Sequence, residues 1–172
     1  MAVDLKAKIR DIPDFPKRGI VFKDIMPLLA DPEALHETVE QLAEFAEPRN
    51  PDLILGAEAR GFILGAALAY RLECGFVAAR KPGKLPWRTV SAKYALEYGF
   101  DALELHADAI TSGARVLVHD DLLATGGTAK AKVDLVEQLG GEVVGLAFVI
   151  ELGFLGGRER LAGYDVHSLI TY

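Results

Sequence analysis

Short apolar segments alternate with helical segments over most of the chain, and this alternation constrains the fold more than any other feature. Strand-like runs occupy residues 53–56, 76–79, 115–119, 143–150 and 166–170, and helical spacing is found at 61–72 and 128–139. Such an alternation is typical of a parallel sheet covered on both faces. The sequence therefore predicts an α/β fold with a central parallel sheet flanked by helices, in which 166–170 is an edge strand.

Two segments depart from the alternation. Helical spacing at Val3–Ile9 is followed by a short strand-like piece, Ile20–Phe22, and Asp31 before Pro32 predicts the start of a helix. The run Lys81–Pro86 cannot continue a strand or a helix, and alternating residues follow it. We expect a two-stranded flexible arm at about 80–105, of the kind that closes over a site and excludes water.

The bulk properties fit one domain covering residues 1–172. The net charge of -6 argues against a general affinity for nucleic acid or for an anionic membrane. Cys74 is the only cysteine, so an intrachain disulfide is excluded. The most apolar stretch, Phe62–Tyr70, is far short of the ~20 residues that a bilayer requires. Since the N-terminus also lacks a signal-like apolar block, we expect a cytoplasmic protein.

A predicted strand, Val116–Val118, leads into two acids and then into a glycine turn before a helix. Glycines let backbone amides converge on one point, and a helix N-terminus adds partial positive charge. With the hydroxyls of Thr125 and Thr128, the segment Ala124–Thr128 predicts a site for a phosphate monoester.

The two acids, Asp120 and Asp121, would repel that phosphate. They suit the hydroxyl donors of a sugar diol, or the water shell of a magnesium ion. A phosphate site beside a diol acceptor describes a ribose 5-phosphate. The alternative is a glycine-rich turn with an acidic helix cap and no ligand. Neither common nucleotide-binding glycine motif, G-x-G-x-x-G or G-x-x-x-x-G-K-[ST], occurs in the chain.

Cations are concentrated between Arg80 and Leu96, where no acid offsets them. A diphosphate needs such compensation, and arginine can hold it through two parallel hydrogen bonds. Arg60 lies in another predicted strand-to-helix turn, beside Gly61. The basic stretch has five cations: Arg80, Lys81, Lys84, Arg88 and Lys93. Of these, Arg88 and Lys93 are better explained as solvated charges.

Taken together, these segments resemble the type I phosphoribosyltransferases, the purine and pyrimidine phosphoribosyltransferase family, and within it the adenine branch. The matching segments run in the same order over nearly the whole chain: 14–16, 19–25, 58–62, 80–81, 83–86, 94, 96–99 and 120–128. The resemblance implies a small N-terminal hood at about 1–30. It also implies the conversion of adenine and 5-phosphoribosyl 1-pyrophosphate (PRPP) to AMP and pyrophosphate, in purine salvage, by a homodimer. Mg²⁺ would be bound mainly through PRPP, with no direct metal ligand from the protein.

The resemblance also implies roles for individual residues. The loop Ala124, Thr125, Gly126, Gly127 and Thr128 would bind the 5′-phosphate, and Asp120 and Asp121 the ribose or metal-bound water. The pyrophosphate would be held by Arg60, Arg80, Lys81 and Lys84. Glu97 would act on the purine proton as the catalytic residue, and Tyr98 would help to close the arm. The adenine pocket would be formed by Val21, Phe22, Lys23 and Leu152.

His119 departs from the pattern, because the family usually has an aliphatic residue there. The sequence favours a tolerated substitution, at an edge or with a local hydrogen bond, over a pH effect on Asp120. Two alternatives stay open for the function. The chain could use guanine, hypoxanthine or orotate as the base, or it could sense PRPP as a non-catalytic module.

Overall fold

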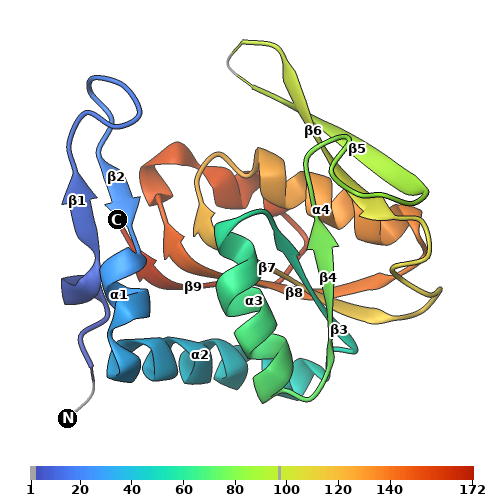
Figure 1. The fold of residues 1–172 in the computed structure, drawn as a ribbon, viewed down its shortest axis with the longest axis horizontal. Coiled ribbons are helices and arrows are strands. Elements are labelled where there is room, and N and C mark those ends of the chain that lie inside the picture. The colour runs from blue at the N-terminus through green and yellow to red at the C-terminus, as the bar shows by residue number, and fades with distance from the viewer. Residues whose placement is uncertain (1–2, 97) are drawn as a thin grey trace.

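A five-stranded parallel sheet forms the centre of the computed structural model, which describes residues 3–96 and 98–172. The strand order is β4-β3-β7-β8-β9. The strands are β3 (Leu53–Ala57), β4 (Gly75–Ala79), β7 (Arg115–Leu123), β8 (Glu142–Glu151) and β9 (Val166–Thr171). The predicted parallel sheet is confirmed, with β9 at one edge (Figure 1).

Side chains that alternate along the strands build one apolar core on each face of this sheet. Val116 and Val118 of β7 pack with α4 (Gly127–Gln138) and the arm. Leu117, between them, points to the opposite face, which α2 (Pro32–Ala46) and α3 (Arg60–Arg71) cover. The helices on both faces agree with the predicted α/β architecture (Figure 1).

The start of α2 follows the predicted capping pattern. The Asp31 side chain accepts hydrogen bonds from the amides of Glu33 and Ala34, at 3.0 and 3.1 Å, and Pro32 occupies the first helical position. Lys8 donates to the same carboxylate at 2.6 Å. This contact ties the N-terminal segment to the helix.

The N-terminal segment differs in detail from the prediction. The expected helix at Val3–Ile9 is a single 3₁₀ turn, η1 (Lys6–Lys8), because the chain then extends into β1 (Arg10–Ile12). This strand pairs antiparallel with β2 (Phe22–Asp24), and α1 (Met26–Ala30) follows. The chain ends beside this hood, where the Lys23 ammonium lies 3.9 Å from the Tyr172 ring centroid (Figure 1).

The predicted two-stranded arm is present as β5 (Thr89–Ala95) and β6 (Phe100–His106), which pair antiparallel. Arg80 and Glu104 exchange backbone hydrogen bonds at its base, at 3.0 and 2.7 Å. Leu103 and Leu105 of β6 are buried in the same core as α4, so the arm covers part of one face of the sheet.

Short 3₁₀ turns complete the fold at η2 (Glu47–Arg49), η3 (Gly153–Leu155) and η4 (Gly157–Leu161). The last two follow β8 and lead into β9. Within residues 3–96 and 98–172, no helix has the length and apolar character needed to cross a membrane.

Candidate active site

The turn between β7 and α4 is held open by close backbone packing. Gly126 has a φ of +86°, in the left-handed region that favours glycine. Gly157 of η4 lies directly behind it, since a Cβ on Gly157 would come within 2.3 Å of the Ala124 carbonyl oxygen. The two glycines therefore let η4 support the turn, and α4 begins at Gly127 with the amide groups of its first turn free to bind an anion.

This turn forms one wall of a cavity of about 250 Å³ at the carboxyl ends of β3 and β7. Ligands of parallel α/β sheets bind at this edge. The cavity brings together residues from β3, α3, the arm and the β7–α4 segment. Its lining residues are Ala57, Glu58, Arg60, Lys81, Tyr94, Leu103 and 120–129.

The two acids at the end of β7 have different environments. Asp120 contacts Lys132 at 2.6 Å and accepts the Asp121 amide hydrogen at 3.0 Å. Burial acts to raise the pKa of Asp120, but the charge and hydrogen bond of Lys132 outweigh it and hold the pKa below its usual value. Burial and the neighbouring Asp120 charge raise the pKa of Asp121 to about 7, against the opposing charge of Arg60.

His119 is completely buried in the middle of the sheet and not at an edge. Its Nδ1 lies 2.9 Å from the Ala147 carbonyl oxygen, which is the local hydrogen bond that the sequence allowed. Burial lowers the pKa of His119 to about 4. The ring is therefore neutral around pH 7, which favours the tolerated substitution over a pH effect on Asp120.

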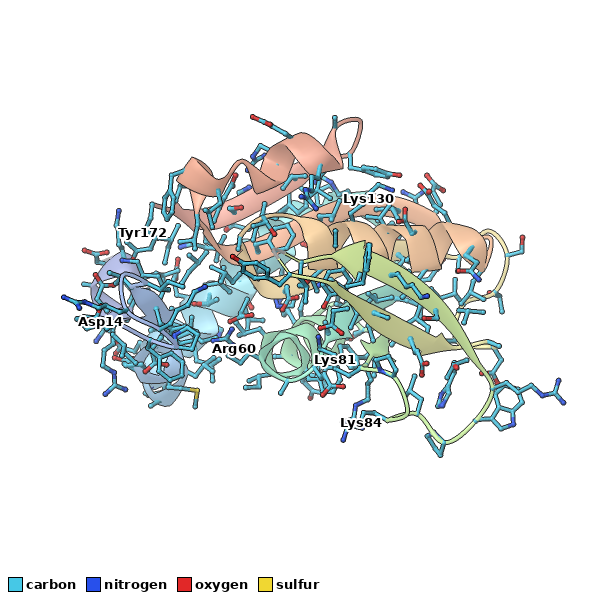
Figure 2. The ribbon with its side chains drawn as sticks, turned by 90° about the horizontal axis from the view of Figure 1, so that it is seen from above. Asp14, Arg60, Lys81, Lys84, Lys130 and Tyr172 are labelled. Atoms are coloured by element: carbon cyan, nitrogen blue, oxygen red, sulfur yellow. The ribbon has the colours of Figure 1, made fainter. Side chains whose placement is uncertain are left out.

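Arg60, the first residue of α3, faces the acids. Its Nε lies 3.0 Å from Asp121 Oδ2, and its guanidinium lies 4.8 Å from the Phe22 ring centroid. The start of α3 can approach the end of β7 because Gly61 has no side chain. A Cβ at this position would lie 2.8 Å from Asp120 Oδ1. Arg60 thus lies where the hood meets the cavity (Figure 2).

Three basic residues that follow β4 contribute unequally to the cavity: Arg80, Lys81 and Lys84. Lys81 lines it and contacts Asp101 and the Tyr94 hydroxyl, the latter at 3.1 Å. Arg80 and Lys84 are not among the lining residues. Arg80 instead donates to Glu58 at 3.3 Å and to the Lys84 carbonyl oxygen at 3.4 Å, and Lys84 lies farther out (Figure 2).

The residues expected to hold a base lie beyond the cavity lining. Val21 is exposed, while Phe22 reaches the site through its contact with Arg60. Lys23 pairs with Asp11 at 2.7 Å. Leu152 follows β8, and its amide donates to the Leu123 carbonyl oxygen at 2.9 Å, which places it beside the end of β7.

The tip of the arm carries the two remaining predicted residues. Glu97 lies outside the described residues. Tyr98 is 86% exposed, so its side chain makes little contact with the rest of the described chain.

Three residues at the site were given no role by the sequence prediction, although two of them, Glu58 and Tyr94, lie in segments that match the family. Glu58 and Tyr94 line the cavity, and Glu58 Oε1 accepts the Lys81 amide hydrogen at 2.7 Å. The position of Glu58 directly after a predicted strand was a usable signal. Lys132 gave none, because a lysine on a helix is normally solvated.

Within the described parts of the chain, no group of three or more His, Cys, Asp or Glu side chains is placed to hold a metal ion. The carboxylate groups that line the cavity are those of Asp120, Asp121 and Glu58. A divalent cation held by a ligand's own oxygens could reach these carboxylates through water.

Comparison with known proteins identifies relatives over almost the full length. A family model described as the phosphoribosyl transferase domain matches residues 30–167. The chain is 58% identical over 170 residues to an adenine phosphoribosyltransferase of Thermotoga maritima, covering 99% of this chain and 98% of the relative. It is 59% identical to one of Clostridium perfringens, with 99% of each chain covered.

Solved structures show the same fold. The crystal structure of adenine phosphoribosyltransferase from Thermoanaerobacter pseudethanolicus superposes with a TM-score of 0.96, at 57% identity and with 98% of each chain covered. The Saccharomyces cerevisiae enzyme, complexed with an imino-altritol bisphosphate and adenine, superposes with a TM-score of 0.92 at 39% identity, with 96% of each chain covered.

Proposed function

Because the chain belongs to the phosphoribosyltransferase family, we propose that its cavity binds PRPP and transfers the ribose 5-phosphate group to adenine. The products are AMP and pyrophosphate, and the role is purine salvage. The relatives at 56–59% identity are named adenine phosphoribosyltransferases, which favours adenine over guanine, hypoxanthine or orotate. The protein is accordingly a transferase of the pentosyl-transferring class.

One observation carries this proposal: a glycine turn suited to a phosphate, three carboxylates and two cations line the same cavity. The turn at Ala124–Thr128 holds the 5′-phosphate through backbone amides and the threonine hydroxyls. The carboxylate of Asp121 accepts hydrogen bonds from the ribose hydroxyls. Arg60 and Lys81 compensate the diphosphate charge, with Arg80 and Lys84 at its outer side.

The distinction between PRPP and AMP tests the role of Arg60. AMP has the 5′-phosphate but lacks the diphosphate. Arg60→Gln should therefore weaken PRPP binding by about tenfold or more while AMP affinity changes little. Calorimetric titration of both ligands measures this. Equal losses for the two ligands would remove Arg60 from the diphosphate side.

The hood supplies most of the pocket that binds the purine base. Phe22, which contacts Arg60 at the edge of the cavity, offers a flat apolar face to adenine, and Val21, Lys23 and Leu152 complete the pocket. Adenine must lose a ring proton when N9 bonds to ribose C1. Glu97 accepts this proton as the arm closes, and Tyr98 packs over the closed site.

Glu97→Gln keeps the size of the side chain but removes the base. We expect kcat to fall by about 10²-fold or more, with the PRPP dissociation constant nearly unchanged. Glu104→Gln, a carboxylate of β6 in the arm, is the matched control. An unchanged kcat in Glu97→Gln would remove this residue from the chemistry.

Mg²⁺ enters with PRPP, bound mainly through the substrate's oxygens. When bound there, the ion would supply charge neutralisation for the diphosphate leaving group. Asp121 faces the cavity and can accept a hydrogen bond from metal-bound water. On the protein side, Arg60 and Lys81 then orient the diphosphate for departure.

The working form is a cytoplasmic homodimer. The exposed face of α3 supports self-association, because Ile63 is 46% exposed and Tyr70, two turns later on the same stripe, is 89% exposed. Light scattering should therefore give twice the 18.6 kDa chain mass. A monomer at working concentration would contradict the dimer.

The competing role is that of a non-catalytic sensor of PRPP, which would use the same 5′-phosphate and diphosphate sites. The arm strands, with Tyr94 and Lys81 at the cavity, favour catalysis, since a sensor does not need water excluded from a reacting bond. A sensor would bind PRPP without releasing pyrophosphate in the presence of adenine.

A further inference from the structure

The loop between β8 and β9, which contains η3 and η4, packs its backbone against the turn Ala124–Thr128, the phosphate turn. Gly157, the first residue of η4, is buried. A Cβ on Gly126 would lie 2.5 Å from the Gly157 carbonyl oxygen, so the two backbones are in van der Waals contact. Because the phosphate turn offers its ligand backbone amides, a displacement of η4 changes where those amides point.

Arg158, the next residue of η4, makes three hydrogen bonds. Its Nε and Nη2 atoms donate to the two carboxylate oxygens of Glu151, at 3.0 and 2.6 Å. Its Nη1 donates to the Val166 carbonyl oxygen at 2.7 Å. Glu151 is the last residue of β8, and Val166 is the first residue of β9. One guanidinium therefore fastens the start of η4 to both of the strands that the loop connects.

The ion pair is partly withdrawn from water. The Glu151 side chain is 8% exposed, whereas the Arg158 side chain is 50% exposed. The hydrogen bonds from Arg158 hold the pKa of Glu151 below its usual value, against the opposing effect of burial, so both groups are charged around pH 7. Two parallel guanidinium–carboxylate hydrogen bonds fix direction as well as distance. Loss of Arg158 would leave a buried carboxylate without its cation.

The two ends of η4 are attached in different ways. Its last residue, Leu161, is 1% exposed and belongs to the apolar core that α4 shares. Its first residue, Gly157, touches the phosphate turn but has no side chain that could pack into a core. Arg158 is directly next to Gly157 in the chain, and its side chain therefore provides the attachment nearest to the contact with the phosphate turn.

We propose that Arg158, through its paired hydrogen bonds to Glu151, is a positioning residue for the 5′-phosphate site, because it holds Gly157 against the phosphate turn. Neither Arg158 nor Glu151 is among the residues that line the cavity, so the pair acts through the backbone of η4 and not by contact with the ligand. The identity of the ligand, a ribose 5-phosphate group, rests on the proposed function.

Arg158→Met removes the guanidinium and keeps an unbranched side chain. We expect the AMP dissociation constant and the KM for PRPP each to rise by about tenfold, because the amides of the phosphate turn no longer converge on one point. The kcat should change by less than about twofold, since the 5′-phosphate is bound alike before and during the reaction. Calorimetric titration with AMP and steady-state kinetics measure these values.

A loss of folding alone would give a different result in the same experiments. A smaller folded fraction lowers the number of AMP sites per chain and the apparent kcat, and it leaves the AMP dissociation constant and the KM unchanged. Arg158→Lys is the milder second variant, because it keeps the charge but cannot form two parallel hydrogen bonds. We expect it to raise the AMP dissociation constant by about threefold.

Arg71→Met is the matched control. The Arg71 guanidinium also donates from Nε and Nη2 to one carboxylate, that of Glu40, at 2.8 and 3.0 Å, but this pair joins α3 to α2 away from the phosphate turn. The Arg71 side chain is 39% exposed. The AMP dissociation constant should change by less than about twofold. An equal rise in Arg71→Met, or an unchanged AMP dissociation constant in Arg158→Met, would overturn the proposal.

A double variant tests whether the two side chains act as one unit. Glu151→Gln alone should raise the AMP dissociation constant by about threefold or more. In the Arg158→Met background it should add less than about twofold, because the attachment is already lost and an unpaired buried charge is removed. If the two substitutions instead multiplied their separate effects, the pairing of Arg158 with Glu151 would not be what positions η4.

AMP titration needs no turnover, so these results are separate from the test of the reaction. If the unsubstituted protein binds AMP but does not convert adenine and PRPP, the proposed function fails while the role of Arg158 is still decided. If the unsubstituted protein catalyses the reaction and Arg158→Met binds AMP equally well, the positioning role alone fails. Absence of AMP binding by the unsubstituted protein would overturn both.

Discussion

Asp120 and Asp121 are neighbours in the chain, yet their surroundings move their pKa values in opposite directions. Lys132 holds Asp120 ionised, whereas burial and the Asp120 charge raise the pKa of Asp121 to about 7. A carboxyl group near neutrality makes ligand binding sensitive to pH in the physiological range. The site therefore has a pH response that neither acid would show if exposed.

This response can be measured as protein stability. The folded state binds a proton at Asp121 between about pH 4 and about pH 7 that the unfolded state has released, so the stabilisation from this proton is complete below about pH 4 and is lost as pH rises through about 7. Asp121→Asn should then gain roughly 2–3 kcal/mol of unfolding free energy relative to the unsubstituted protein between about pH 5 and about pH 8. Urea unfolding of both proteins at about pH 5 and about pH 8 measures this gain. If the two proteins differed in unfolding free energy by the same amount at both pH values, Asp121 would not titrate in this range.

Among single residues, the sequence predicted the phosphate turn, the adjacent acids, Arg60 and Lys81, and the structure brings all of these to one cavity. These residues were recognisable because local backbone chemistry defines them: glycines, hydroxyls and acids directly after a strand. Lys132 was not predictable, since it reaches the site by packing between elements distant in sequence, whereas Tyr94 lay in a segment that matches the family but was given no role.

At the scale of elements, the phosphate turn depends on η4 behind it. Gly157→Ala would place a Cβ 2.3 Å from the Ala124 carbonyl oxygen, a backbone atom that cannot rotate away. We expect a loss of about 1–3 kcal/mol in unfolding free energy and weaker binding of both AMP and PRPP.

Gly153→Ala, in the adjoining turn η3, provides the control. Its Cβ would first meet a methyl group, Thr171 Cγ2, at 3.3 Å, and that side chain can shift. Calorimetric titration of both variants with AMP measures whether the turn needs the support of η4. Unchanged AMP affinity in Gly157→Ala would show that the turn does not need this support.

The arm is joined to the cavity by Lys81, Asp101 and the Tyr94 hydroxyl, which lies 3.1 Å from Lys81 Nζ and 3.2 Å from Asp101 Oδ2. Tyr94→Phe removes both hydrogen bonds and keeps the ring. The KM for PRPP should rise by about fivefold, because the loss of these two hydrogen bonds leaves Lys81 less well oriented toward the cavity. Tyr70→Phe, on the exposed face of α3, should have no effect on KM; a matching rise there would contradict a specific role for Tyr94.

Most helices and strands were predictable because the spacing of apolar residues and the length of each segment distinguish buried strands from amphipathic helices. β7 extends to Leu123, beyond the predicted end at His119, because parallel pairing with β8 continues through the acids. β1 was missed altogether. It has three residues and pairs with a strand ten residues away, so tertiary pairing and not local pattern defines it.

At the scale of the whole molecule, a net charge of -6 coexists with a cavity that carries Arg60 and Lys81. The parallel sheet explains how this is achieved, since the carboxyl ends of neighbouring strands meet at one edge. The hood, the arm and η4 surround that edge from three sides (Figure 1). A local site suited to a small anionic ligand is thus compatible with an acidic protein.

Release of pyrophosphate from PRPP in the presence of different bases tests the central claim most directly. With adenine, the protein should release pyrophosphate and form AMP in equal amounts. Guanine, hypoxanthine and orotate should give rates lower by about 10²-fold or more, because a base-binding site rejects analogues whose polar groups it cannot pair. Turnover with one of those bases in place of adenine, or PRPP binding without pyrophosphate release from any of them, would contradict it.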